Sequence, residues 1–124
     1  MDRLLHDPQI LNQAVVILPF SFRPNGTSAI DADETKGLGV TVTRTGVGTF
    51  LVTLDDITYD FISCIVSMQK ATAADIVPQI VGAIDVSAKT FSIKTLAVAT
   101  PTDVSSSANS RVHGLCFLRN SNVQ

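Results

Sequence analysis

The sequence predicts an all-β fold: a single antiparallel β-sandwich or jelly-roll-like domain of about seven strands, preceded by a short N-terminal arm. Three observations support this. Short runs rich in β-branched and aromatic residues recur along the chain, several alternate between apolar and polar residues, and turn signals separate them at short spacing. The chain has 124 residues, which fits one ordinary domain. We therefore assign residues 14–124 to the sandwich and residues 1–13 to the arm.

The predicted strands follow one another without a convincing long helix between them. They are 14–22, 40–43, 50–54, 61–69, 77–84, 90–97 and 111–119. Pro19 in the first strand favours an edge position or a bulge, because proline lacks the amide hydrogen that a central strand donates. Strict alternation at 40–43 is typical of a half-buried strand, and Gly46 and Gly48 predict a hairpin to its partner. In the fourth strand one face carries an apolar residue at every second position, namely Ile62, Cys64, Val66 and Met68.

Two polar loops, 23–36 and 98–109, are longer than the usual connections in a compact domain. The first opens on a strong turn signal, Arg23-Pro24-Asn25-Gly26. Loops of this length are commonly functional, so we expect both to be contact loops.

Charge and hydropathy limit the possible functions. Hydrophobic residues make up 45% of the chain and charged residues only 16%, against about 25% in ordinary soluble domains. A surface so poor in charge can be partly hidden against copies of the chain or another protein. With nine basic and eleven acidic residues and no Lys/Arg cluster, we expect no nucleic-acid partner. The start of the chain lacks a signal-peptide pattern, and the apolar run at 14–20 is shorter than the ~20 residues that cross a bilayer. We therefore expect synthesis inside the cell and no membrane partner.

Catalysis needs convergent groups of matched type, and the sequence offers few. His6 falls in the arm. His113 alternates with Arg111 on the last predicted strand, where the pair forms either an anion or proton-transfer site or, more simply, a polar rim. Acidic residues in the first long loop lack the glycine and ligand ladder of a calcium site, so we interpret them as a solvated acidic loop: Asp31, Asp33 and Glu34. We expect no enzyme activity, no cofactor and no metal.

The two cysteines, Cys64 and Cys116, each lie within an apolar run. We interpret both as buried thiols that act as small hydrophobic side chains, which disfavours a reactive thiolate. A disulfide is possible only if their strands lie side by side.

An ordered series of short segments carries a resemblance to a known family. The segments are Arg23-Pro24-Asn25-Gly26, Lys36-Gly37-Leu38-Gly39-Val40, 43–54, 73–75, 82–86, 89–90, 109–113 and 118–120. In this order they resemble small virion proteins encoded by tailed bacteriophages and prophages, and the resemblance covers nearly everything after Ala14. It implies a β-sandwich structural protein of the virion, made in the cytoplasm of the bacterial host. Within that class it favours a head decoration (cement) protein, often trimeric, that sits on the capsid shell and contacts the major capsid protein.

We expect partner contacts through the apolar residues of the arm and through the start of the first long loop. The residues are Leu4, Leu5, Ile10, Leu11, Arg23 and Asn25. The arm is too short for a core of its own, and exposed apolar termini commonly become ordered on docking. Apolar residues on both faces of a strand, such as Leu51 beside Phe50 and Val52, also predict self-association, as a homotrimer.

Two other functions fit the same composition. One is a phage tail or baseplate subunit. The other is a receptor-binding domain that recognises a surface glycan. A glycan site usually exposes aromatic rings, and the absence of Trp and the single Tyr59 weigh against it.

Overall fold

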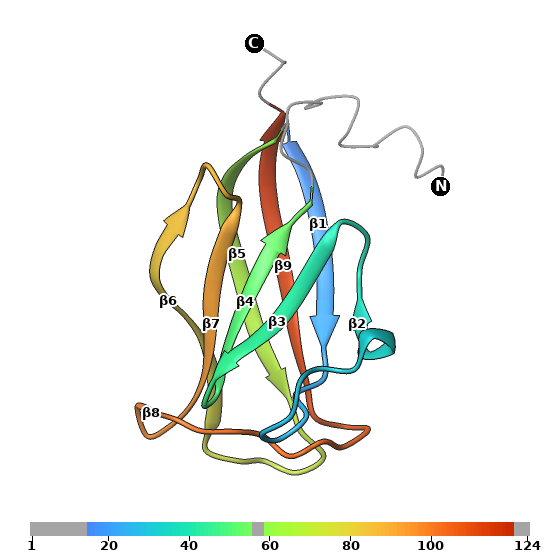
Figure 1. Ribbon diagram of the computed structural model, residues 1–124, viewed down its shortest axis with the longest axis vertical. Coiled ribbons are helices and arrows are strands. Elements are labelled where there is room, and N and C mark those ends of the chain that lie inside the picture. Colours follow the sequence, from blue (N-terminus) through green and yellow to red (C-terminus); the bar gives the residue numbers. More distant parts are fainter. Residues whose placement is uncertain (1–14, 56–58, 121–124) are drawn as a thin grey trace, which may run out of the picture.

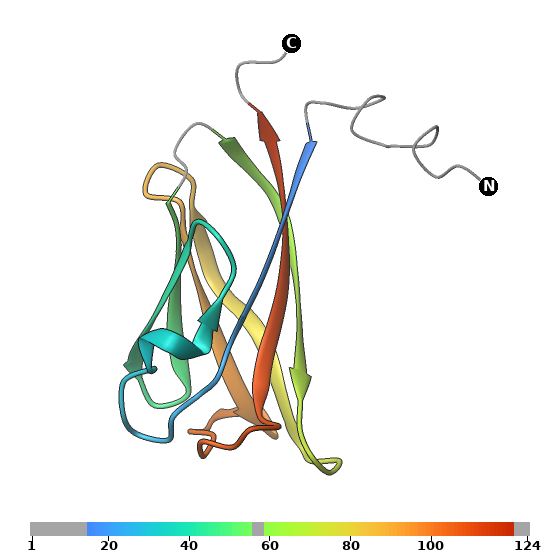
Figure 2. The ribbon, with the colours of Figure 1, turned by 90° about the vertical axis from the view of Figure 1, so that its right-hand side faces the viewer.

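The computed structural model describes residues 15–55 and 59–120, which form two antiparallel β-sheets packed face to face (Figures 1 and 2). Sheet A has four strands in the order β2-β1-β9-β5. Their bounds are Thr35–Lys36 (β2), Val15–Phe22 (β1), Arg111–Asn120 (β9) and Tyr59–Gln69 (β5). Sheet B has the order β3-β4-β7-β6, with β8 paired to β7. Their bounds are Val40–Gly46 (β3), Thr49–Leu54 (β4), Thr90–Ala97 (β7), Ile76–Asp85 (β6) and Thr100–Pro101 (β8). The predicted all-β sandwich is confirmed.

All seven predicted strands are present, and the long loops contain more structure than the sequence indicates. A 3-10 turn, η2 (Ala32–Glu34), leads directly into β2, which pairs with the end of β1. The second long loop contributes β8, which pairs with the end of β7. These two-residue strands are too short to show a periodicity, so the count of about seven strands was low. The predicted arm, residues 1–13, lies outside the described residues.

The position of Pro19 is explained by the pairing of β1. This strand pairs with β9 along its length, but β2 reaches it only at Ser21 and Phe22. The other edge of β1 is therefore unpaired at Pro19, where a missing amide hydrogen costs nothing. The predicted edge position is confirmed.

The core lies between the inner faces of the two sheets, where alternate residues of each strand meet. Its buried members are Phe20, Phe22, Val40, Val42, Phe50, Val52, Leu54, Phe91, Ile93, Val112, Cys116 and Leu118. Two ring pairs join the sheets: Phe22 lies 4.9 Å from Phe50 and Phe20 lies 6.4 Å from Phe91, between centroids. Gly114 faces Phe20 across β1 and β9, and a Cβ there would overlap the Phe20 ring. A glycine in the central strand thus makes room for an aromatic side chain.

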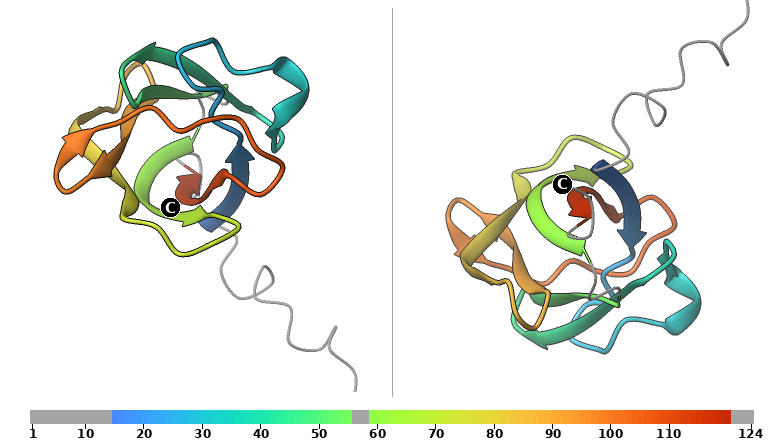
Figure 3. Two further views of the ribbon diagram at one scale, coloured as in Figure 1. Left: turned by 90° about the horizontal axis from the view of Figure 1, so that it is seen from below. Right: turned by 90° about the horizontal axis from the view of Figure 1, so that it is seen from above.

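The two ends of the sandwich differ. At one end, the lower end in Figure 1, lie the connections 23–31, 47–48, 70–75 and 102–110, which we call the loop end and which Figure 3 shows from below. At the other end β1 begins and β9 finishes, since Val15 pairs with Arg119. The eight residues of β1 separate the two ends by about 26 Å. Val15, the first described residue, therefore lies at the end opposite the long loops.

Candidate assembly surfaces

The outer face of sheet A carries a contiguous group of apolar side chains. Ile17 lies opposite Phe117, while Pro19, Leu115 and Ile65 form the neighbouring row across β1, β9 and β5. Ile17 is 55% exposed and Ile65 is 62% exposed, and Leu115 and Phe117 are half-buried between them. We call these five residues the apolar patch. Isolated exposed apolar residues are ordinary, but a contiguous group on a sheet commonly marks an interaction surface.

Polar residues border the apolar patch toward the loop end. The next row across the sheet is Ser21, His113 and Ser67, and beyond it Arg111 pairs with Gln69. His113 Nε2 lies 2.7 Å from Gln69 Oε1, so the ring is held against β5. An apolar centre with a polar border is the usual anatomy of a protein interface.

Arg111 is committed to an internal ion-pair network. Its guanidinium donates to Glu34 Oε2 at 2.9 Å, to the Glu34 carbonyl at 2.8 Å and to Ser21 Oγ at 3.1 Å. Arg23 lies 3.2 Å from the other carboxylate oxygen of Glu34. The interpretation of a purely solvated acidic loop is therefore wrong for Glu34, which fastens the first long loop to sheet A. Asp31 and Asp33 are exposed, as expected.

The two long loops meet at the loop end. The Gly26 amide donates to the Val104 carbonyl at 2.8 Å and so joins one loop to the other. Asn25 Nδ2 donates to the Ala29 carbonyl at 3.1 Å, which closes the turn at the start of the first loop. Arg23 and Asn25 thus have internal partners, and their role as partner contacts stays a prediction. Leu4, Leu5, Ile10 and Leu11, and also His6, lie outside the described residues.

A second network fixes the β3–β4 hairpin to the loop after β8. The Arg44 guanidinium donates to both carboxylate oxygens of Asp103, at 3.0 and 3.1 Å, and the Gly48 amide donates to Asp103 Oδ1 at 2.8 Å. These bonds hold the pKa of the Asp103 carboxyl below its usual value, despite the opposing effect of burial. The bond from the Gly48 amide makes the largest contribution to this lowering. Thr95 Oγ1 also donates to the Thr102 carbonyl at 2.7 Å. The loop end is therefore built from cross-linked segments.

No local pattern in the sequence predicts these ion pairs. Arg44 and Asp103 are 59 positions apart, and Arg111 and Glu34 are 77 apart. Only the order of the strands brings them together, and a single sequence does not state that order. The turn signal at Arg23-Pro24-Asn25-Gly26 and the hairpin glycines Gly46 and Gly48 were local cues to the turns of this end, but not to the contacts between them.

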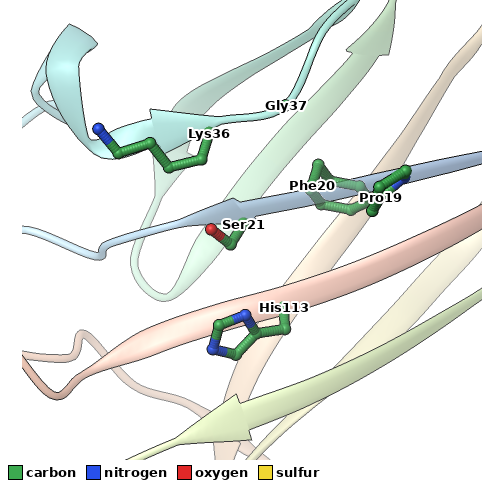
Figure 4. Close-up of a pocket in the computed structure, with 6 residues that line it drawn as sticks. All are labelled: Pro19, Phe20, Ser21, Lys36, Gly37 and His113. Carbon is green, nitrogen blue, oxygen red and sulfur yellow. The ribbon is translucent and has the colours of Figure 1, made fainter.

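A shallow depression of about 310 Å³ lies beside the polar border of the patch, between β1, β2 and β9. Figure 4 shows the residues that line it, which are Pro19, Phe20, Ser21, Lys36, Gly37 and His113. Of these lining residues, only Lys36 and His113 have titratable side chains. Arg111 and His113 do not form a joint site, because the first binds Glu34 and the second contacts Gln69. Their position at the start of β9, between the apolar patch and the loop end, fits the simpler interpretation as a polar rim.

Within residues 15–55 and 59–120, no group of three or more His, Cys, Asp or Glu side chains is placed to hold a metal ion. No helix among the described residues is long and apolar enough to cross a membrane.

The cysteines are brought side by side. Cys64 on β5 and Cys116 on β9 are direct register partners, and their Sγ atoms are 3.4 Å apart. Cys116 is buried as predicted, whereas Cys64 is only half-buried. The condition that the sequence left open for a disulfide, adjacent strands, is met.

Comparison with known proteins adds no relative. No family model matches the chain, and neither a curated protein nor a solved structure shows significant similarity to it.

Proposed function

We propose that this protein is a structural subunit of a virion, a head decoration (cement) protein that assembles as a homotrimer and binds the capsid shell of a tailed bacteriophage. The observation that carries the proposal is the apolar patch on sheet A, with Ile17 and Ile65 each more than half exposed. The resemblance of segments after Ala14 to small phage virion proteins supplies the biological setting. No residue has a catalytic role in this proposal.

The apolar patch suits a second copy of the same chain. None of its five side chains is charged, and Arg111, on the same face, is already ion-paired with Glu34. Contact between copies therefore removes apolar surface from water without burying an unpaired charge. Around a three-fold axis the same patch of each copy can converge, which closes the assembly at three chains.

The loop end suits the shell. Its two longest loops are joined by the bond from Gly26 to Val104, and the Arg44–Asp103 pair fixes its hairpin. Surfaces that are already ordered lose little conformational entropy on docking. Three copies present three such ends, so modest contacts add up through multivalency.

Stabilisation of the shell follows from mass action. A protein that binds only the assembled shell loses its binding free energy when the shell opens, so it shifts the equilibrium toward the closed state. Packaged DNA presses on the shell from inside, and decoration then raises the load at which subunit contacts fail.

Electron microscopy of intact particles tests the proposed location. We expect density for a trimeric β-domain on the outer surface of the head. Density on the tail or baseplate instead would contradict the head location and support the tail-subunit alternative.

Particles that lack the protein test the role. We expect them to assemble but to break at lower temperature, or on chelation of divalent cations, than complete particles. Particles that are equally robust but no longer attach to cells would contradict the cement role and support the receptor-binding alternative.

Variants of the loop end separate shell binding from self-association. Thr27→Glu combined with Ser106→Glu places charge on two exposed loop positions. We expect weaker binding to undecorated heads with the trimer unchanged. Thr43→Glu on the outer face of sheet B is the matched control and should bind as the wild type does. Equal binding by all three proteins would show that the loop end does not face the shell.

A further inference from the structure

The cysteine pair is arranged for covalent cross-linking. Directly opposite residues of antiparallel strands have Cα atoms about 4.5–5.5 Å apart, which lies inside the range of about 4.4–6.8 Å found in disulfides. The observed Sγ separation of 3.4 Å is that of two thiols in contact. Formation of a bond of about 2.05 Å therefore needs a small rotation of the side chains and no change of strand register.

The two thiols differ in access and in acidity. Both lie on the inner face of sheet A, where Cys64 is half-buried on the edge strand β5 and Cys116 is buried on the interior strand β9. The Cys116 S–H donates to Cys64 Sγ, which lowers the pKa of Cys64 and raises the pKa of Cys116. Cys64 is thus the thiol that an oxidant reaches and the one that more readily forms a thiolate.

We propose that Cys64 and Cys116 are a disulfide-forming pair in which Cys64 reacts first and Cys116 resolves, closing an intramolecular cross-link between β5 and β9. The pair folds as free thiols in a reducing compartment and closes when the protein meets a small-molecule disulfide such as oxidised glutathione. This inference is independent of the proposed function.

The chemistry balances in two exchange steps. The Cys64 thiolate attacks one sulfur of oxidised glutathione, whose own S–S bond breaks, so that one glutathione leaves as a thiolate and the other is bonded to Cys64. Cys116 then gives its proton to water and attacks Cys64 Sγ, expelling the second glutathione as a thiolate. The two protein thiols lose two electrons and two protons, and the oxidant becomes two molecules of glutathione thiol. The main cause of the raised pKa of Cys116, its hydrogen bond to Cys64, is removed by the first step.

The cross-link would join β5 and β9, two of the three strands that carry the apolar patch. β5 is the last strand of sheet A and is paired in this sheet only with β9. A bond between Cys64 and Cys116 locks that pairing and closes a loop between positions 52 apart in the chain. Constraint of the unfolded chain over such a loop resists thermal opening of the sheet.

Oxidation of the purified folded protein by glutathione tests the proposal. We expect an intramolecular disulfide, seen as the loss of two hydrogens by intact mass and as a reducible Cys64–Cys116 peptide pair. The thermal unfolding midpoint should rise by about 10 °C and return on reduction. Persistence of both thiols under conditions that oxidise the urea-unfolded chain would overturn the proposal, as would formation of disulfides only between molecules.

Two single variants test the order of attack. In Cys116→Ala the resolving thiol is missing, so we expect Cys64 to accumulate one glutathione in the folded state. In Cys64→Ala we expect the remaining buried Cys116 to stay unmodified on the same time scale. Equal modification of the two variants, or faster modification of Cys116, would overturn the assignment of roles. The wild-type experiment stays decisive if either variant fails to fold.

Discussion

The outer faces of the two sheets differ far more than their inner faces do. On the inside, both sheets present alternating Phe, Val, Leu and Ile side chains to one core. On the outside, strands β3, β4 and β7 of sheet B present mainly hydroxyl-bearing residues, among them Thr41, Thr43, Thr49, Thr53, Thr90 and Ser92, and the exposed Val77 stands on the edge strand β6. The corresponding face of sheet A carries the apolar patch. The fold constrains only the inner face, so the composition of the outer face reflects what the protein contacts.

The similar contributions of the two inner faces to the core can be tested by removing one aromatic side chain from each sheet. Phe22 of sheet A and Phe50 of sheet B are both fully buried and contact each other. We expect Phe22→Ala and Phe50→Ala each to lower the free energy of unfolding by about 3–5 kcal/mol. Because the rings touch, the double variant should cost less than the sum. Urea unfolding measures all three. A cost under about 1 kcal/mol for either single variant would contradict a core shared by both sheets.

The hydrogen-bonded ion pair between Arg44 and Asp103 at the loop end predicts a smaller, pH-dependent effect on the free energy of unfolding. Asp103→Asn keeps an acceptor for the Gly48 amide but loses the charge opposite Arg44, and we expect a cost of about 1–2 kcal/mol at neutral pH. The pKa of Asp103 is lowered by folding. The contribution of the Asp103 carboxylate to the free energy of unfolding is therefore complete above the pKa of the unfolded chain, about 3.9, and is lost as the pH falls through the lower pKa of the folded protein. Urea unfolding from pH 7 to pH 2 should show the two proteins converging at low pH.

A matched control for this effect is Asp33→Asn, in an exposed position of η2. We expect it to change the free energy of unfolding by less than about 0.5 kcal/mol at neutral pH. If the free energies of unfolding of Asp103→Asn and the wild type changed in parallel with pH, a stabilising role for the Asp103 carboxylate would be contradicted.

The smallest effect on stability is expected from deletion of residues 1–12. The core of the described part of the chain draws on residues from Val16 onward, so the deletion should shift the free energy of unfolding by less than about 0.5 kcal/mol. Attachment to heads should weaken, because the arm contributes Leu4, Leu5, Ile10 and Leu11 and, at up to about 3.5 Å per residue, is long enough to reach from its end of the domain past the loop end. Urea unfolding and co-sedimentation with undecorated heads measure the two effects. An unfolded truncated protein, or unchanged attachment, would refute the expected role of the arm.

The sequence predicted the strands well because alternation is a local property. The runs at 40–43 and 50–54 bury Val40, Val42, Phe50, Val52 and Leu54 as their spacing requires. β2 and β8 were missed because each is only two residues long and is set by the strand beside it. The hydrogen bonds of the loop end depend on strand order, which no local pattern contains.

The sequence predicted that an outer face carries apolar residues, but not which sheet carries them. This prediction came from the low charge and from strands with apolar residues on both faces, and such residues are present. The residue chosen as an example, Leu51, is half-buried and lies in a row with Thr43 and Ser92 on sheet B. The contiguous group lies instead on sheet A, because β1 and β5 flank β9 and align Ile17, Phe117, Leu115 and Ile65 across three strands. That alignment requires the strand order.

Analytical ultracentrifugation of a matched pair of variants tests most directly whether the apolar patch of sheet A mediates self-association. Ile65→Lys places a charge in the patch, and Thr43→Lys places the same charge on the outer face of sheet B. Both positions are exposed, so both variants should keep the wild-type circular dichroism spectrum. We expect trimers for the wild type and Thr43→Lys, and monomers for Ile65→Lys, at high micromolar concentration. A monomeric wild type, or an Ile65→Lys variant that stays trimeric, would contradict the account.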